Sequence, residues 1–467
     1  MSNKPKSLRS RGFTLLELLV GAAVGAVVLV GISLTFISQA QQYQAHASRR
    51  GVQANARQAL AFMERTLRIT GYGVDPDRAV LAYDSYNPVT DTQQPGYPDA
   101  IVLHWRDALF RRPAQTVTGN SISLAPADVL KEPMRKGQIL LVICAPDPGS
   151  SDFTVNSNPP HAFVTVGNYT PAGAANIPLD TLAPASAPNS PQQGAGRLFH
   201  EQTALGAGPP CFHSATHPPF VVLIHRAAFY VAQFDNDGDP ATPERTPYLM
   251  MHQGLDMPGV ADPMGDGTID ANDAVPVAEG IEQLQVAYIL DTNSTDTDNV
   301  PIILGVNQLM GPDHYGENWE MIGAPSTYPA QPNTFPALVP GWFFNPGYPK
   351  HYTQDEMTRL RLADLGPNIR QVRLTVVARS SVPDQQIRGD NLLVHDDGTQ
   401  YPDGPALSDP GASKAWRHLE NLSLQIPAAD FAPSGGHFYR TILRQAVAPK
   451  NLLLTRQFIP VNENGGG

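Results

Sequence analysis

Cysteine is nearly absent from this sequence, which has only two in 467 residues, Cys144 and Cys211. No Cys-x-x-Cys pair occurs, so neither a zinc ribbon nor a thioredoxin-like redox site is indicated. In an oxidising compartment the two residues can form one disulfide, and otherwise they are two buried free thiols. The sequence leaves both states open, because nothing in it brings the sulfur atoms together.

Motifs of common enzyme families are also missing. The sequence contains no G-x-S-x-G, no P-loop, no G-x-G-x-x-G and no H-E-x-x-H. We therefore expect no enzyme and no required cofactor. Charged residues make up only 16% and the net charge is −11, which argues against direct nucleic-acid binding. The 45 prolines and 39 glycines follow no period, which is typical of a loop-rich β protein.

The N-terminus has a basic segment followed by a long apolar one. Residues 1–12, MSNKPKSLRSRG, contain no acidic residue, and residues 13–37 are apolar apart from Glu17. As a helix with a rise of about 1.5 Å per residue, the apolar run spans roughly 37 Å, enough to cross a hydrocarbon core of about 30 Å. The basic flank predicts that the N-terminus stays in the cytoplasm and that the rest of the chain is exported.

Two simple explanations of this segment fit less well. A cleaved secretory signal has an apolar region of about 7–15 residues, shorter than this run, although Ala45-His46-Ala47 offers a suitable cleavage site. A plain membrane anchor leaves Glu17 unexplained, because a carboxylate within an apolar helix costs about 2.5–3.5 kcal/mol on insertion scales. We therefore expect Glu17 to have a specific partner.

The nonapeptide that begins at Gly12, GFTLLELLV, resembles the leader signal of type IV prepilins and type II secretion pseudopilins. The resemblance implies that a membrane aspartyl peptidase, the prepilin peptidase, cuts after Gly12 and methylates the new N-terminal Phe13. It also implies that Glu17 is an assembly residue. A buried carboxylate needs a cation, and in a filament the Phe13 amine of a neighbouring subunit would supply it.

The helical pattern continues beyond the apolar run. No proline occurs between Phe13 and Thr70, and Gly71 and Gly73 give a stop signal. We expect one continuous helix over 13–70, with a transmembrane part and an amphipathic end that packs on a globular domain. The apolar residues that recur at helical spacing in that end are Val52, Ala56, Ala59, Leu60, Met63 and Leu67.

Beyond the helix, short β-branched runs alternate with clusters of Pro, Gly, Asn and Asp, which is typical of strands. The expected fold class is α+β: a long N-terminal transmembrane and amphipathic helix packed on a large β-rich domain with loop insertions. The domain organisation predicted is a leader at 1–12, the helix at 13–70, and a periplasmic or extracellular domain at 71–467 with insertions at 167–210 and 291–368. The predicted strands are Ala100–Trp105, Gln138–Ile143, Ala162–Val166, Phe220–Phe234, Tyr248–His252, Ile281–Leu290, Val372–Ala378 and Phe438–Gln445.

Four short segments resemble the PilW-type branch of minor pilins: Lys136-Gly137-Gln138, Tyr230 at a strand end, Glu279–Tyr288 and His437–Arg440. This resemblance implies a minor pilin, in or near the filament tip, with roles in adhesion and twitching motility. Its partners would be other minor and major pilins, the inner-membrane assembly platform and a tip adhesin. Before assembly it would be a single-pass inner-membrane protein. The alternatives are a type II secretion minor pseudopilin, whose domain is usually much smaller, and a membrane-anchored periplasmic enzyme or binding protein.

One acidic loop has the layout of a 12-residue calcium loop. Residues 262–273 place carboxylates at loop positions 1, 5, 9 and 12 and Gly267 at position 6. Met264 occupies position 3, where an oxygen ligand is expected, and the aspartate at position 12 reaches less far than glutamate. A calcium ion and a solvated turn therefore both remain open. The candidate ligands are Asp262, Asp266, Thr268, Asp270 and Asp273.

Overall fold

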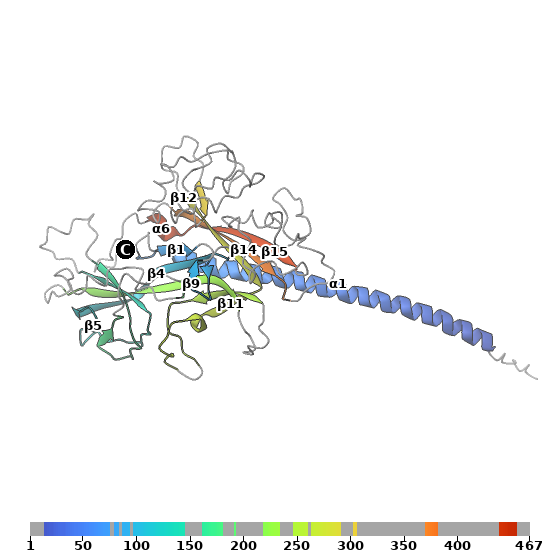
Figure 1. Ribbon diagram of the computed structural model, residues 1–467, viewed down its shortest axis with the longest axis horizontal. Coiled ribbons are helices and arrows are strands. Elements are labelled where there is room, and N and C mark those ends of the chain that lie inside the picture. The colour runs from blue at the N-terminus through green and yellow to red at the C-terminus, as the bar shows by residue number, and fades with distance from the viewer. Residues whose placement is uncertain are drawn as a thin grey trace, which may run out of the picture. The chain divides into compact units, whose positions relative to one another are not determined.

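The structure is a computed structural model (Figure 1). It describes residues 14–74, 79–83, 86–93, 97–144, 161–180, 191–192, 218–233, 246–259, 263–290, 302–305, 369–381 and 439–454. The chain forms two compact units, residues 1–51 and residues 52–467. The second unit contains all of the sheets and the C-terminal part of the long helix.

The predicted continuous helix is confirmed as α1 (Leu15–Ile69), which has 55 residues. It ends where Gly71 and Gly73 adopt positive φ angles of 83° and 64°. Residues with a Cβ rarely adopt such angles, so the two glycines stop the helix. A Cβ on Gly71 would also lie 2.6 Å from Cδ2 of Leu452, so this turn has no room for a side chain.

The larger sheet in the described part of the chain has nine antiparallel strands. Its main path runs in the order β11-β10-β9-β4-β5-β8, with β1 beside β4, β6 beside β9 and β7 beside β6. The strands are β1 (Val80–Tyr83), β4 (Ala100–Val117), β5 (Ser121–Leu124), β6 (Ile139–Ile143), β7 (His161–Thr165), β8 (Asn176–Pro178), β9 (Phe220–Gln233), β10 (Pro247–His252) and β11 (Val275–Glu279).

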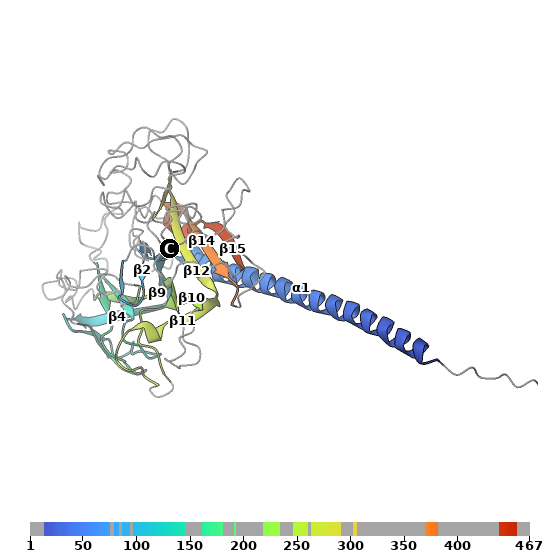
Figure 2. The same cartoon turned by 45° about the vertical axis from the view of Figure 1, so that its right-hand side comes forward.

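A second sheet has four antiparallel strands in the order β13-β12-β14-β15, and its strands β12, β14 and β15 run side by side in Figure 2. The chain passes from β11 into this sheet at Gly280, whose φ is +74°. A Cβ there would lie 2.4 Å from the carbonyl oxygen of Arg379, so this corner needs glycine. The strands are β12 (Ile281–Leu290), β13 (Ile302–Gly305), β14 (Ile369–Arg379) and β15 (Arg440–Val447); β2 (Tyr86–Asn87) and β3 (Thr92–Gln93) form a separate pair.

The main hydrophobic core contains one face of α1 together with strands from both sheets. Met63 and Leu67 of the helix are fully buried in the same cluster as Phe229 of β9 and Leu284 of β12. The residues that the helical spacing predicted to face a domain are all buried, which confirms the amphipathic end. They are Val52, Ala56, Ala59, Leu60, Met63 and Leu67.

A short C-terminal helix, α6 (Lys450–Leu454), caps the end of α1. Nδ2 of Asn451 donates to the carbonyl oxygens of Ile69 and Thr70, at 3.1 and 3.3 Å. These carbonyls lie at the helix end, where no following turn provides an N–H donor. A residue more than 380 positions away in the chain therefore completes the helix.

All eight predicted strands are confirmed, and the ends of seven of them lie within about three residues of the predicted ones. Residues 167–210 contain the short strand β8, which pairs with β5, and residues 291–368 contain β13, which pairs with β12. The first predicted strand also ends too early. It continues beyond a bulge between Arg106 and Arg111, into a polar stretch that lacks a strand pattern.

Candidate functional site

The N-terminal part of α1 exposes an almost uninterrupted apolar surface. All of its side chains from residue 14 to residue 40 are exposed, and Leu15 is 79% exposed. Among the described residues, α1 is the one helix long and apolar enough to cross a membrane, by length and composition. Such a surface is stable when lipid or other apolar helices cover it.

Glu17 lies in the first turn of this helix. Its Oε2 accepts hydrogen bonds from the backbone N–H and the hydroxyl of Thr14, at 3.0 and 3.1 Å. The N–H of Glu17 donates in return to Oγ1 of Thr14 at 3.3 Å, so the two residues form a reciprocal cap. A carboxylate here also meets the positive end of the helix dipole. Gly12 and Phe13 lie outside the described residues, and their roles in cleavage and methylation stay predictions.

The predicted calcium loop is described from residue 263 onward, so Asp262 lies outside the described residues. Asp266 and Asp270 each accept a backbone N–H from two residues further on, at 2.7 and 2.8 Å, while Thr268 is exposed. These bonds are Asx turns. Within the described segments, no three His, Cys, Asp or Glu side chains are grouped closely enough to hold a metal ion. Calcium binding by this loop therefore stays a prediction.

Asp273 is buried and belongs to a short 3-10 helix, η4 (Ala271–Asp273). Its Oδ1 accepts the N–H of Met257 at 2.7 Å, and its Oδ2 accepts the N–H of Asp270 at 2.9 Å. The pKa of Asp273 is raised above its usual value, mainly by burial. The two amide donors oppose this shift, and the neighbouring carboxylates of Asp270 and Asp256 add to it. The residue predicted as the last calcium ligand thus ties the C-terminal end of the loop to the backbone of Met257.

His252 anchors the same loop to the end of β10. Its Nδ1 accepts the N–H of Gly254 at 2.8 Å, so its Nε2 carries the proton and donates to the carbonyl oxygen of Asp270, also at 2.8 Å. Burial, followed by the nearby charge of Arg226, lowers the pKa of His252 to about 4. The side chain is therefore neutral at physiological pH.

Cys144 is buried directly after β6 and is disulfide-bonded. Cys211 is the one other cysteine of the sequence and lies outside the described residues. The pair Cys144–Cys211 therefore stays a prediction, which thiol labelling under denaturing, non-reducing conditions decides.

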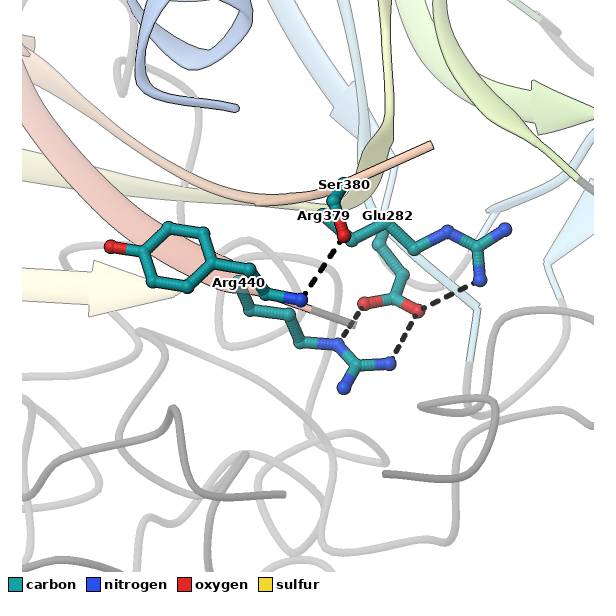
Figure 3. Close-up of polar contacts among 5 residues, drawn as sticks. Glu282, Arg379, Ser380 and Arg440 are labelled. Atoms are coloured by element: carbon teal, nitrogen blue, oxygen red, sulfur yellow. Dashed lines mark hydrogen bonds and ion pairs between the residues drawn. The ribbon is translucent and has the colours of Figure 1, made fainter. Parts of the chain in front are cut away.

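A buried ion cluster joins three strands of the smaller sheet (Figure 3). Nε of Arg440 lies 2.6 Å from Oε2 of Glu282, and its Nη2 lies 3.2 Å from Oε1. Nη1 of Arg379 reaches the same carboxylate at 3.6 Å. The pKa of Arg379 is lowered, mainly by burial. The nearby charge of Arg440 adds to this shift, and the charge of Glu282 opposes it. The cluster links β12, β14 and β15, and its geometry fits a structural role.

Sequence reasoning did not identify this cluster. Glu282 and Arg440 both lie in segments that resemble the PilW-type branch, but they are separated by 158 positions. The available signal is a glutamate at the start of an apolar strand, which requires a cationic partner once buried. The sequence does not say which arginine provides it.

The family model described as the prokaryotic N-terminal methylation motif matches residues 7–33. Neither a search of curated proteins nor a search of solved structures gave a significant match. The matched region includes Gly12, Phe13, Glu17 and the start of the exposed apolar helix, so it supports a type IV prepilin-like signal.

Together, the methylation motif, the apolar helix and the β-rich remainder support a protein of the type IV pilin-like or pseudopilin-like class. The motif supports methylation of a prepilin, and the helix fits anchoring in a membrane by a single span. Its partners are then components of a pilus-type system in general.

Proposed function

We propose that this chain is a minor pilin of a type IV pilus, a structural subunit of the PilW type that helps to initiate filament assembly. The observation that carries the proposal is the methylation motif placed directly before an exposed apolar helix with Glu17 in its first turn. A helix of this kind serves first as a membrane anchor and then as the packing element of a filament. No catalytic step is needed for that role.

The proposed life cycle follows from the order of the segments. The precursor sits in the inner membrane with its basic leader in the cytoplasm. Prepilin peptidase cuts after Gly12 and methylates Phe13, and the subunit then leaves the bilayer through the assembly platform. The apolar face that lipid covered is afterwards covered by the helices of other minor and major pilins.

Glu17 has a specific part in this proposal. In the single chain its carboxylate accepts hydrogen bonds from Thr14. In the filament the cationic N-terminal amine of a neighbouring Phe13 would pair with the same carboxylate. Such a pair offsets the desolvation of both charges, which neither could tolerate alone in an apolar core.

The size of the β-rich unit supports a place at the filament tip. A subunit inside a helical lattice must leave room for neighbours above and below it, whereas a terminal subunit meets neighbours on one side only. The unit that follows α1 carries a nine-stranded and a four-stranded sheet, and a bulky domain of this kind is accommodated most easily at an end. A tip adhesin is a proposed neighbour there.

A type II secretion minor pseudopilin is the second candidate, because the methylation motif is common to both classes. The large domain favours the pilus. The genes next to the one that encodes this chain distinguish a minor pilin from a pseudopilin. Other prepilin-like genes together with a tip-adhesin gene support the pilus, whereas secretin and secretion-ATPase genes support the pseudopilin.

The Glu17→Val variant tests the assembly role. We expect it to be processed and retained in the membrane but absent from sheared pili, because breaking one side of a buried ion pair typically costs about 3–5 kcal/mol. The matched control is Thr35→Val, which replaces another exposed polar residue of the same apolar run without removing a charge. Recovery of the Glu17 variant with pili at the control level would show that Glu17 is not an assembly contact.

A further inference from the structure

Arg106 is a buried arginine for which the described part of the chain supplies no counter-ion. It lies on β4, directly before the bulge, and only 7% of it is exposed. Its Nε is buried without an acceptor, and its guanidinium makes no hydrogen bond or ion pair with any described residue. A buried charge is costly unless it is paired and hydrogen-bonded, so an anion is expected beside it.

The adjacent carboxylate is engaged elsewhere. Oδ1 of Asp107 accepts the N–H groups of Leu109 and Phe110, at 2.7 and 2.9 Å, in an Asx turn that shapes the bulge. Its Oδ2 lies 2.9 Å from Nε2 of His225. Because successive side chains of a strand point to opposite faces, Asp107 lies on the other face of β4 from Arg106. The nearest acid in the chain is therefore not the missing partner.

A second arginine shares the face of Arg106. Arg106 is paired with Ile224 of β9, and Arg111 is paired with Val222. Since these two β9 residues are two positions apart, both arginines belong to the same face of the sheet. Cζ of Arg111 lies 4.4 Å from the ring centroid of Phe220, which holds this guanidinium by a cation–π contact. The three β9 residues belong to one buried apolar cluster, so two cations share a largely apolar surface.

The surroundings of Arg106 contain another cation and a further hydrogen-bond donor. The pKa of Arg106 is lowered, mainly by burial; Tyr72 and Asp107 oppose this shift, and the charge of Arg111 adds to it. The carbonyl oxygen of Tyr72 accepts the N–H of Arg106 at 2.8 Å, and Tyr72 is 39% exposed. A phenol can donate a hydrogen bond to an anion, so Tyr72 adds a third donor group near the two arginines.

We propose that Arg106 and Arg111 form a binding site for a small phosphate-type oxyanion beside the end of α1. An ion of a few atoms can reach a residue that is more than nine-tenths buried, whereas the surface of another protein cannot. Arginine presents its N–H groups in a fork that matches phosphate oxygens. A phosphate group with about two negative charges balances two arginines, whereas a carboxylate balances one. The site does not depend on the role of α1 in a filament.

Isothermal titration of sodium phosphate into the purified full-length protein in detergent measures the binding, at constant ionic strength in chloride and with sodium acetate as a second probe. The variants are Arg106→Met, which keeps the apolar stem and removes the charge, and Arg111→Gln. Loss of a hydrogen bond to a charged group should weaken phosphate binding about tenfold or more. The matched control is Arg65→Gln at an exposed position of α1, which should bind phosphate as the parent protein does.

Thermal unfolding separates binding from a purely structural role. The parent protein should melt at a higher temperature in phosphate than in chloride, because the anion binds the folded chain. Arg106→Met should lose this shift and should still fold in chloride, since it removes a buried charge. Should it fail to fold, the partly exposed Arg111→Gln carries the test alone. Absence of phosphate binding in the parent, unchanged binding in either arginine variant, or equal affinity for acetate would overturn the proposal.

Discussion

At the scale of single residues, the buried charges make the most specific demands on the fold. Glu282 and Arg440 are 2% and 1% exposed at their side chains, and Arg379 is 8% exposed. One carboxylate thus pairs with two guanidinium groups where little water reaches. Removing the carboxylate would leave two like charges close together, which is far less favourable than losing a surface ion pair.

We expect Glu282→Gln to lower the free energy of unfolding by about 3–5 kcal/mol, because both buried arginines lose the charge of this carboxylate. Exposed Glu132→Gln makes the same chemical change and should alter stability by less than about 0.5 kcal/mol. Urea denaturation of both variants measures the difference. Equal stability of the two would mean that the cluster does not hold β12, β14 and β15 together.

His252 gives the stability a defined pH dependence. An unfolded histidine titrates near pH 6.5, and the pKa of His252 in the folded chain is about 4. Between these values the unfolded state binds a proton that the folded state does not. The free energy of unfolding should therefore fall as the pH decreases from about 6.5 to about 4, by up to about 3 kcal/mol from this residue.

The His252→Gln variant should be less stable than the parent near neutral pH. Its free energy of unfolding should also fall less steeply as the pH decreases, because the proton taken up by this histidine on unfolding is removed. Denaturation midpoints measured from about pH 7 to about pH 4.5 give the slope. His46→Gln, an exposed position on α1, should keep the slope of the parent. A His252 variant with the full slope would contradict a neutral, buried imidazole.

At the scale of elements, α1 is one helix with two environments. Its first part exposes apolar residues all round, and its last part buries one stripe against two sheets. The periodicity of 3.6 residues made this stripe predictable, since every buried position recurs at helical spacing. Strands with apolar alternation were predictable for the same reason.

Two of the strands that were not predicted, and the second half of β4, lack a local signal. β8 and β13 have only three and four residues, and the second half of β4 contains arginine, proline and glutamine. These segments become strands because a partner aligns with them, as β5 does with β8. The residue pattern of one segment does not identify the distant segment that pairs with it, so a single sequence could not predict these strands.

Two adjacent residues of α1 test the stripe. Met63 is fully buried, whereas Phe62 is 46% exposed on another face of the helix. We expect Met63→Ala to destabilise the folded chain by about 2–5 kcal/mol through loss of burial and a residual cavity. Phe62→Ala removes a larger side chain but should cost less than about 1 kcal/mol. Similar losses for both would mean that this helix end does not pack as described.

At the scale of the whole molecule, one chain combines an apolar helix of membrane-spanning length with a large β-rich unit. The methylation motif and the helix were recognisable in the sequence because a basic segment, a glycine and a glutamate occur at fixed spacing before a long apolar run. The way in which the remainder folds depends on contacts between its ends, such as Asn451 on the carbonyl of Ile69. A helix end and a tail more than 380 positions apart carry no common motif.

The most direct test of the central claim is the mass of the mature N-terminus. We predict that protein from the native host begins at Phe13, that this residue carries one added methyl group, and that residues 1–12 are absent. A Gly12 replacement with a bulky side chain should leave the leader attached, because the peptidase must accommodate the residue before the cut bond. An N-terminus at Met1, at a site after Ala47, or at an unmethylated Phe13 would contradict the assignment to the processed pilin-like class.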